Sequence, residues 1–472
     1  MRLLLALSFV VSLFLSQALL AEVRLPAVIS DHMLLQRDQP ARIWGWAAPG
    51  EKIVVSIAGE SAVAAADTDG RWQVKLPALK AGGPYTMTVQ GVNRVVVNDV
   101  LFGEVWFCSG QSNMAMGVVK AHQADREIAA ADFPKIRLLT VPEARSEQPR
   151  EDAKVKWLVC SPRTVSYFSA TAYFFGRSLH QELDVPVGLV VSAVNGTRIE
   201  PWTAGVGISA VEALKEIDKP VNGDLYNAMI HPLTPMTLRG AIWYQGEGNV
   251  GDPSVRYYRR MQALIGGWRQ AWGLGDFPFY YVQIAPLNWG GKPKDIHAEV
   301  WEAQAMALRI PNTGMAVTTD IGHIGDAHPK NKQEVGRRLA LWALAKTYGR
   351  SKLAFSGPIF QGMAVQGERV RLHFHHAEGL TSRDGKPLTW FTIAGSDGKF
   401  VPALAQIEGE SVVVSAAGIA EPKSVRFGWH QNAEPNLMNK HGLPASPFRT
   451  DAPDFGDPAQ LPRKKDANHA LR

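Results

Sequence analysis

The stretch EVWFCSGQSNMAM, residues 104–116, decides how the fold is interpreted. Residues 105–108 form an unbroken apolar run, which is typical of a strand buried on both faces. The run then breaks at a Ser-Gly-Gln segment, and Ser112 stands where a helix can begin. In an open parallel sheet, ligands bind beyond the carboxyl ends of the strands, because loops and helix N-termini converge there. We therefore predict a strand ending near Cys108 that presents Ser112 to a ligand.

The same order of strand, loop and helix recurs between residues 100 and 350. Further strands are predicted at VPVGLVVS (185–192), RGAIWYQ (239–245), FPFYYVQIA (277–285) and MAVTTD (315–320). Helices are predicted at ATAYFFGRSLHQEL (170–183), RYYRRMQALIGGWRQAWG (256–273) and KNKQEVGRRLALWALAKTYG (330–349). This alternation predicts an α/β fold whose parallel sheet is covered by helices on both faces.

Apolar alternation with period two, interrupted by Ala-Pro-Gly and Asp-Gly turns, flanks this region on both sides. It predicts N- and C-terminal β-sandwich-like regions. The chain has 472 residues, of which 46% are hydrophobic, so it can bury a sizeable core. The predicted division is a signal peptide (1–21), an N-terminal β domain (22–99), a catalytic domain (100–350), a C-terminal β region (351–452) and a loose tail (453–472).

The first residues, MRLLLALSFVVSLFLSQALLA, have the pattern of a secretory signal. Arg2 precedes an apolar stretch, and small residues follow it, so cleavage is expected after Ala18 or Ala21. We expect a secreted or periplasmic protein without a membrane anchor. The formal net charge is +6, but much of it lies in Arg2 and in the tail RKKDANHALR. The body is therefore close to neutral, and nothing in it indicates a nucleic-acid partner.

The chain contains two cysteines, Cys108 and Cys160. An exported protein of this size that relied on disulfides would carry more cysteines. We expect both to be small buried residues in strands, and a disulfide between them is the less favoured alternative.

Polar residues follow several of the predicted strands and indicate acyl-transfer chemistry. A serine hydroxyl needs a general base within hydrogen-bond reach, and that base needs an orienting group. We predict Ser112 as the nucleophile, His328 as the base and Asp326 as its orienter. The backbone N–H groups of Ser112 and Gly196 and the side chain of Gln245 are predicted to form an oxyanion hole. A glycine at 196 would let the backbone approach the substrate closely.

Four motifs carry a family resemblance: GEVWFCSGQSNM, WYQGEGN, GDAHPKNKQEVGRRLAL and GLPASPFRTD. With them the chain resembles the sialate O-acetylesterase family of SGNH-type (GDSL-like) hydrolases, secreted serine esterases that remove acetyl groups from sugars. The resemblance covers nearly the whole mature chain. It implies the same roles for Ser112, Gly196, Gln245 and His328, and it implies that no cofactor is needed.

Some positions depart from the family pattern. Position 248 is Gly where the family often has Ser, and Arg198 stands where a small residue or proline is expected. We interpret Arg198 as a substrate contact. In the wider superfamily the acid commonly lies three residues before the histidine, whereas Asp326 lies two before and Gly325 occupies the usual place. Asp320 is therefore an alternative acid, and a Ser-His dyad is a third arrangement.

Other polar residues near the predicted site have two interpretations. Gln111 and Glu247 are candidates for binding substrate. A buried charge is normally paired, so Glu247 is better explained as holding the Ser112 loop or an arginine. Asn113 and Asn249 are interpreted as bracing loops.

Two rival functions remain at this stage. Asp320, His323, Asp326 and His328 could ligate a metal in a metal-dependent hydrolase, although this leaves Ser112 unexplained. Alternatively, the 14 tryptophans could serve a non-catalytic carbohydrate-binding protein, although most fall in periodic core positions. For the esterase, the predicted partner is an acetylated sugar, either a 9-O-acetyl sialate or a plant polysaccharide, selected by loops 116–155 and 286–298.

Overall fold

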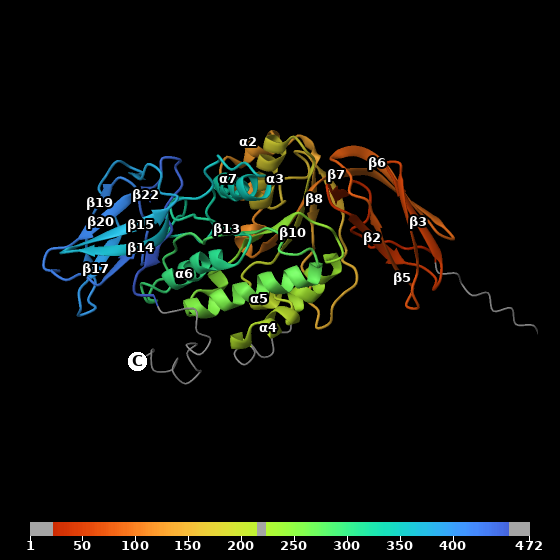
Figure 1. Cartoon of the computed structure of the whole chain (residues 1–472). Helices are drawn as coiled ribbons and strands as arrows, with labels where there is room; N and C mark the ends of the chain where they lie inside the picture. The colour runs from red at the N-terminus through yellow and green to blue at the C-terminus, as the bar shows by residue number, and fades with distance from the viewer. Residues whose placement is uncertain (1–21, 215–222, 453–472) are drawn as a thin grey trace, which may run out of the picture.

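The computed structural model describes residues 22–214 and 223–452 (Figure 1). Its central sheet is formed by β7 (Arg94–Gly110), β8 (Phe133–Thr140), β9 (Trp157–Cys160), β10 (Val187–Ala193), β11 (Gly240–Tyr244), β12 (Phe279–Val282) and β13 (Thr313–Ala316). The spatial order is β13-β12-β11-β7-β10-β8-β9. Neighbours from β13 to β8 run parallel, but β9 pairs antiparallel with β8. The sheet is therefore mixed, which corrects the predicted all-parallel sheet at this edge.

Helices lie on both sides of this sheet (Figure 1). On one side α3 (Ala170–Leu183) packs against α7 (Lys332–Trp342), and on the other α5 (Ser254–Trp272) packs with α4 (Gly205–Ala210) and α6 (Ala298–Met306). The short helices are α1 (Ser112–Ala115) and α2 (Ala124–Ala129). The helix predicted over 170–183 is confirmed as α3, and its first turn is capped by Ser169, which accepts the Ala172 N–H at 3.1 Å.

Single turns of 3₁₀ or π helix occur in the connecting segments. They are η1 (Val118–Lys120), η2 (Glu200–Trp202), η3 (Glu212–Leu214), η4 (Tyr226–Ile230), η5 (His231–Leu233), η6 (Glu247–Asn249), η7 (Ala307–Arg309) and η8 (Ala343–Thr347). The segment expected as a loop at 116–155 is partly regular, because it contains α2 and β8.

Strand β7 joins the N-terminal β region to the central sheet. The N-terminal strands are β1 (Leu34–Gln36), β2 (Ala41–Trp46), β3 (Lys52–Ile57), β4 (Glu60–Ala65), β5 (Arg71–Leu76) and β6 (Gly82–Gln90). The first part of β7 pairs antiparallel with β6, and its last part pairs with β10 and β11. The boundary expected between residues 99 and 100 thus falls inside one continuous strand, and buried side chains of both regions belong to one hydrophobic core.

The C-terminal region is a set of antiparallel strands with a core of its own. They are β14 (Ile359–Gln366), β15 (Arg369–His375), β16 (Thr381–Ser382), β17 (Phe391–Ala394), β18 (Val401–Pro402), β19 (Leu404–Glu408), β20 (Ser411–Ser415), β21 (Ser424–Phe427), β22 (Leu437–Met438) and β23 (Phe448–Arg449). Arg449 donates to both carboxylate oxygens of Glu302 in α6, at 2.8 and 2.7 Å. This ion pair fastens the region to the central domain.

Large aromatic side chains fill the central core. The fully buried tryptophans are Trp106, Trp157, Trp202, Trp243, Trp268, Trp272 and Trp301.

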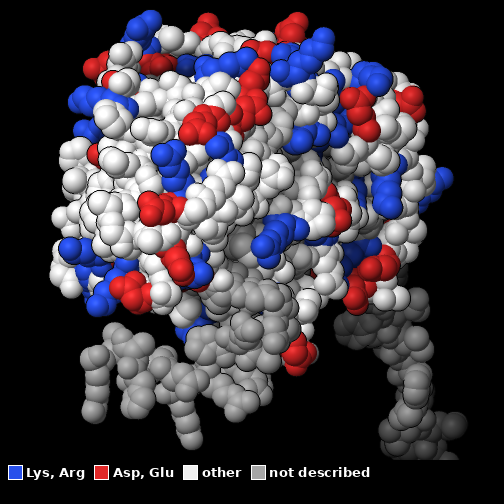
Figure 2. Space-filling view, turned by 60° about the vertical axis from the view of Figure 1, so that its left-hand side comes forward, with Lys and Arg blue, Asp and Glu red and all other residues white. Residues whose placement is uncertain are grey.

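Cys108 and Cys160 are both buried and unpaired, as expected. No helix in the two described ranges is long and apolar enough to cross a membrane. The predicted signal peptide (1–21) and tail (453–472) lie outside the described residues. Figure 2 shows Lys and Arg interspersed with Asp and Glu on the face that it presents.

Candidate active site

The ends of three neighbouring strands bring the site together. Gly110 at the end of β7 pairs with Ala193 in β10 and with Tyr244 in β11, so the loops after these strands start at the same level. Gly110 has φ +142°, and an added Cβ would lie 2.1 Å from the carbonyl oxygen of Tyr244. Only glycine fits there. The chain can therefore turn sharply into α1, which begins at Ser112.

Ser112 faces a histidine from a distant segment of the chain. His328, in the loop that follows β13, places its Nε2 atom 2.8 Å from the Oγ atom of Ser112. On the other side of the ring, Nδ1 lies 3.3 Å from Oδ1 of Asp326, and the same oxygen accepts the backbone N–H of His328 at 2.8 Å. A hydroxyl, an imidazole and a carboxylate in this order are the arrangement that activates a serine nucleophile.

Asp320, the alternative acid, pairs with an arginine and not with His328. Its two carboxylate oxygens accept from the guanidinium of Arg338 at 2.6 and 2.7 Å, and both side chains are buried. Of the two aspartates, Asp326 is therefore the one in contact with His328. Because Asp320 is paired with Arg338, it is also not available as a metal ligand. Within 22–214 and 223–452, no group of three His, Cys, Asp or Glu side chains lies close enough together to hold a metal ion.

Two backbone N–H groups were predicted for the oxyanion hole, those of Ser112 and Gly196. Gly196 lies in a turn after β10 with φ +67°. An added Cβ would meet no atom within 4 Å, so glycine serves the left-handed turn and not the close approach that the sequence suggested. In the described part of the chain, the N–H groups of Ser112 and Gly196 donate to no backbone or side-chain acceptor. Their role in an oxyanion hole stays a prediction.

Gln245 does not fit the role predicted for it. Its side chain is fully buried and donates to the carbonyl of Thr197 at 3.2 Å and to Oδ1 of Asn249 at 2.8 Å. Its Oε1 accepts from the hydroxyl of Tyr257 at 2.8 Å. Both N–H bonds of the amide are therefore used inside the protein. The geometry supports a brace between the loops after β10 and β11 in place of an oxyanion donor.

A cavity of about 520 Å³ opens beside the serine and histidine. Its wall is formed by Met116, Val119, Lys120, Ala121, Asp326, His328 and Lys330. The two lysines are exposed. The cavity thus combines an apolar side with two cations next to His328.

Comparisons with known proteins identify the family of the chain. Residues 103–345 match the family described as carbohydrate esterase, sialic acid-specific acetylesterase. The sialate O-acetylesterases of Pongo abelii and Homo sapiens are each 31% identical to the chain, over 90% of its length and 92% of theirs. The chain belongs to this family. It is a carboxylic ester hydrolase. A crystal structure of a carbohydrate acetylesterase from Xanthomonas citri superposes with a TM-score of 0.86 at 39% identity, covering 91% of this chain and all of that one.

Two residues predicted to bind substrate in this esterase have protein partners instead. Gln111 is almost fully buried, and its side-chain oxygen accepts the N–H of Gly248 at 3.1 Å. Arg198 donates to both carboxylate oxygens of Asp252 at 2.9 Å and to the carbonyl of Gly248 at 3.1 Å. Arg198 is half-exposed, but its charge is already neutralised. It is therefore not an unpaired cation, and its contact with a substrate stays a prediction.

Arg198 belongs to a larger set of charges that we call the outer network. Its members are Arg198, Glu200, Asn249, Asp252 and Arg260. Asn249 donates to Glu200 at 3.1 Å and to Asp252 at 2.8 Å, and its oxygen accepts the backbone N–H of Ile199 at 2.9 Å. The outer network therefore joins the loop after β10 to the segment before α5, and the bracing role expected for Asn249 is confirmed.

A second set, the inner chain, lies beneath the reactive serine and consists of Glu247, Asn113 and Lys332. Nδ2 of Asn113 donates to Oε1 of Glu247 at 2.5 Å and to the carbonyl of Ala327 at 2.8 Å. Nζ of Lys332 donates to Oδ1 of Asn113 at 2.5 Å. Glu247 thus holds the Ser112 segment, in agreement with the structural interpretation, and does not lie free for a substrate.

Burial perturbs both ends of the inner chain. It lowers the pKa of Lys332 to about 7, against the opposing charges of Glu247 and Asp326. Burial also raises the pKa of Glu247, which the hydrogen bond from Asn113 and the charge of Lys332 partly counteract. Sequence reasoning missed Lys332. Its spacing from Val335 and Leu339 places it on the buried stripe of α7, where a charged residue is rare and signals a specific role.

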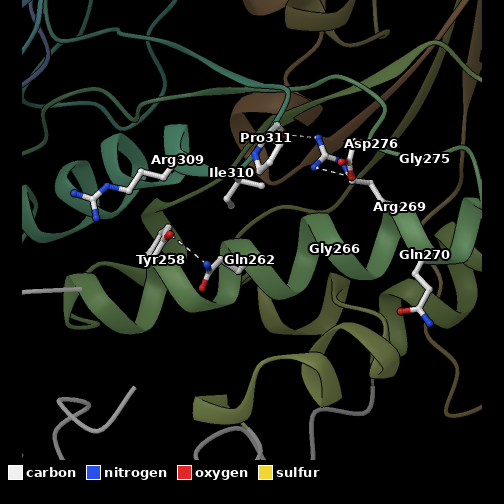
Figure 3. A pocket seen from close by; sticks show the side chains of 10 residues that line it. All are labelled: Tyr258, Gln262, Gly266, Arg269, Gln270, Gly275, Asp276, Arg309, Ile310 and Pro311. Atoms are coloured by element: carbon white, nitrogen blue, oxygen red, sulfur yellow. Dashed lines mark hydrogen bonds and ion pairs between the residues drawn. The ribbon is translucent and has the colours of Figure 1, made fainter. Parts of the chain in front are cut away.

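A second hollow in the surface, along α5, lacks this chemistry (Figure 3). Its labelled side chains include Tyr258, Arg269 and Arg309. Arg269 donates to the backbone carbonyls of Phe277 and Pro311, which fixes the end of α5. No serine, cysteine or histidine lines it. It therefore offers no alternative nucleophile.

Proposed function

We propose that this esterase removes acetyl groups from O-acetylated sugars through an acyl-enzyme on Ser112. The observation that carries the proposal is the 2.8 Å contact between Oγ of Ser112 and Nε2 of His328, next to an open cavity. We assign the catalysis to residues 100–350, within which the family match at 103–345 falls.

In the proposed reaction, Oγ of Ser112 attacks the acetyl carbonyl carbon while His328 takes the hydroxyl proton. Asp326 orients the imidazole and stabilises its positive charge. The N–H groups of Ser112 and Gly196 donate to the oxyanion of the tetrahedral intermediate. His328 then protonates the departing sugar oxygen as the ester C–O bond breaks. Water, activated by the same histidine, attacks the acetyl-enzyme and releases acetate. No step requires a cofactor.

Two sugar classes are candidates for the substrate. The curated relatives are sialate O-acetylesterases, and Lys120 and Lys330 in the cavity wall favour a sugar that carries a carboxylate. The Xanthomonas citri relative is a carbohydrate acetylesterase, so a neutral plant polysaccharide is the alternative. Acetate release from 9-O-acetylated sialate and from acetylated hemicellulose, measured side by side at matched acetyl content, distinguishes the two.

Export completes the proposal. The basic and apolar start of the sequence supports secretion or transfer to a periplasm. Sequencing the N-terminus of the exported protein is expected to show a start at Leu19 or Glu22. An intact Met1 in the mature protein would contradict it.

The activity is tested with 4-nitrophenyl acetate on the wild type and on the Ser112→Ala and His328→Ala variants, each with and without EDTA. Both substitutions are expected to lower turnover by at least about 10³-fold, and the chelator is expected to have no effect. Undiminished turnover in Ser112→Ala would refute the serine mechanism. Loss of activity in EDTA that added zinc restores would revive the metal-dependent alternative.

A further inference from the structure

Three segments that are distant in sequence meet at the side chain of Asn113. Asn113 directly follows Ser112, and it bonds to Ala327, which directly precedes His328. It also bonds to Lys332 at the start of α7 and to Glu247 in η6. Asn113 is 1% exposed and Lys332 is fully buried. One amide group therefore joins the backbone that carries the nucleophile to the backbone that carries the base.

The charges at the two ends fix how this amide is oriented. When Lys332 is protonated it can only donate, so it requires the oxygen of Asn113, and ionised Glu247 can only accept, so it requires the nitrogen. With this orientation the nitrogen also faces the carbonyl of Ala327. A flipped amide would place its oxygen against a carboxylate and a carbonyl, and its nitrogen against an ammonium group. The orientation that holds Ala327 is thus selected electrostatically.

The inner chain is poorly built for stability alone. Oε2 of Glu247 is buried and has no partner among the described residues, and the two charges do not touch each other. Because the two charges are separated, their Coulomb attraction offsets little of the cost of removing them from water. A protein with well-packed apolar residues at such positions is often at least as stable. The function of the inner chain is therefore better explained by the segments of Ser112 and His328, which it positions.

We propose that Lys332, Asn113 and Glu247 are positioning residues of this esterase, which hold Ser112 and His328 at hydrogen-bonding distance by fixing the amide of Asn113 against Ala327. This inference rests on the proposed serine mechanism. None of the three side chains touches the substrate. Displacement of a catalytic group by about 1 Å costs on the order of 100-fold in rate, so loss of this orientation acts on kcat.

The test uses the full mature chain with 4-nitrophenyl acetate, and it compares Asn113→Leu, Lys332→Met and the double variant Lys332→Met/Glu247→Gln. Lys352→Met, which removes an exposed lysine, is the matched control. We expect kcat to fall about 100-fold in all three, with KM within threefold of wild type, and no change in the control. Thermal melting is measured on every variant.

The double variant separates positioning from stability. Removing both charges eliminates the uncompensated group that Lys332→Met leaves behind, so its melting temperature is expected to return close to that of the wild type. Its kcat is expected to stay low, because no charged group then selects the orientation of the Asn113 amide. A double variant with wild-type kcat would overturn the inference while leaving the serine mechanism intact. Wild-type turnover that does not depend on Ser112 would refute both.

Discussion

The outer network and the inner chain brace the same loops by different means. In the outer network the carboxylate oxygens of Glu200 and Asp252 all accept hydrogen bonds, from Arg198, Arg260 and Asn249. In the inner chain one oxygen of Glu247 has no partner in the described residues, and the amide of Asn113 separates Glu247 from Lys332. The outer network, whose carboxylates are fully hydrogen-bonded, stabilises the loops. The inner chain instead fixes the orientation of the Asn113 amide beside Ser112.

Removing a carboxylate from the outer network tests its part in stability. Asp252→Ala removes a carboxylate that pairs with the buried guanidinium of Arg260, so the free energy of unfolding is expected to fall by about 3–5 kcal/mol. Urea denaturation measures this. Glu408→Ala, which breaks a half-exposed pair with Arg371, is the control and is expected to change little. If the two variants were equally stable, the outer network would not stabilise the loops.

Gln245 provides a sharper test, because the two interpretations of it predict different losses. As a brace, Gln245→Leu leaves the carbonyl of Thr197 without a donor and removes one of the hydrogen bonds to Oδ1 of Asn249, which costs about 1–3 kcal/mol of stability. Turnover of the folded variant is then expected to fall less than tenfold. As an oxyanion donor, its loss would lower kcat by about 10²–10³. Paired denaturation and steady-state kinetics decide between them.

The inner chain also predicts a pH dependence of stability. Burial lowers the pKa of Lys332 from 10.5 to about 7, so between these values the unfolded chain binds a proton that the folded protein does not. The penalty for burying this amine is complete below pH 7 and fades as the pH rises. The groups facing it are Asn113, Tyr244, Glu247 and Asp326.

We therefore expect the free energy of unfolding of the wild type to rise, relative to Lys332→Met/Glu247→Gln, between pH 7 and about pH 9.5. Urea titrations of both proteins across this range measure the difference. A difference that does not change with pH would show that Lys332 titrates alike in the folded and unfolded states.

Arg198 carries the smallest expected effect. Because Asp252 already neutralises its charge, Arg198→Ala is expected to change KM for an acetylated sugar less than threefold. The main consequence is a modest loss of stability from the outer network. A KM increase of tenfold or more, confined to sugars with a carboxylate, would restore the substrate contact that the sequence suggested.

Sequence reasoning succeeded where local signals are strong. The helix at 170–183 has a capping serine and an apolar stripe, and the observed α3 spans the same residues. Strand β8 was missed because Lys135 and Arg137 interrupt its apolar run. Arg137 is nevertheless buried, since both of its terminal nitrogens donate to the carboxylate of Asp99, at 2.6 and 2.9 Å. A long-range partner of this kind cannot be read from a local pattern.

The same limit applies to the site. Ser112, Gly196 and His328 could be selected as candidates because each follows a strand, and parallel strands end at one edge of a sheet. The contact between Ser112 and His328 is observed, whereas the role of Gly196 stays a prediction. The partners of Gln245 and Lys332 could not, because hydrogen bonds there are shared among loops from three strands and a helix. Whether a side-chain amide such as that of Gln245 remains free for a substrate depends on which hydrogen bonds it makes inside the protein. Residue type alone does not reveal those hydrogen bonds.

The most direct test of the serine mechanism is the rate and position of labelling by a fluorophosphonate probe, read by peptide mass spectrometry in the wild type and in His328→Ala. We expect one adduct, on Ser112, whose formation slows at least about 100-fold without the histidine. An adduct on another residue, or equal rates in the two proteins, would contradict it.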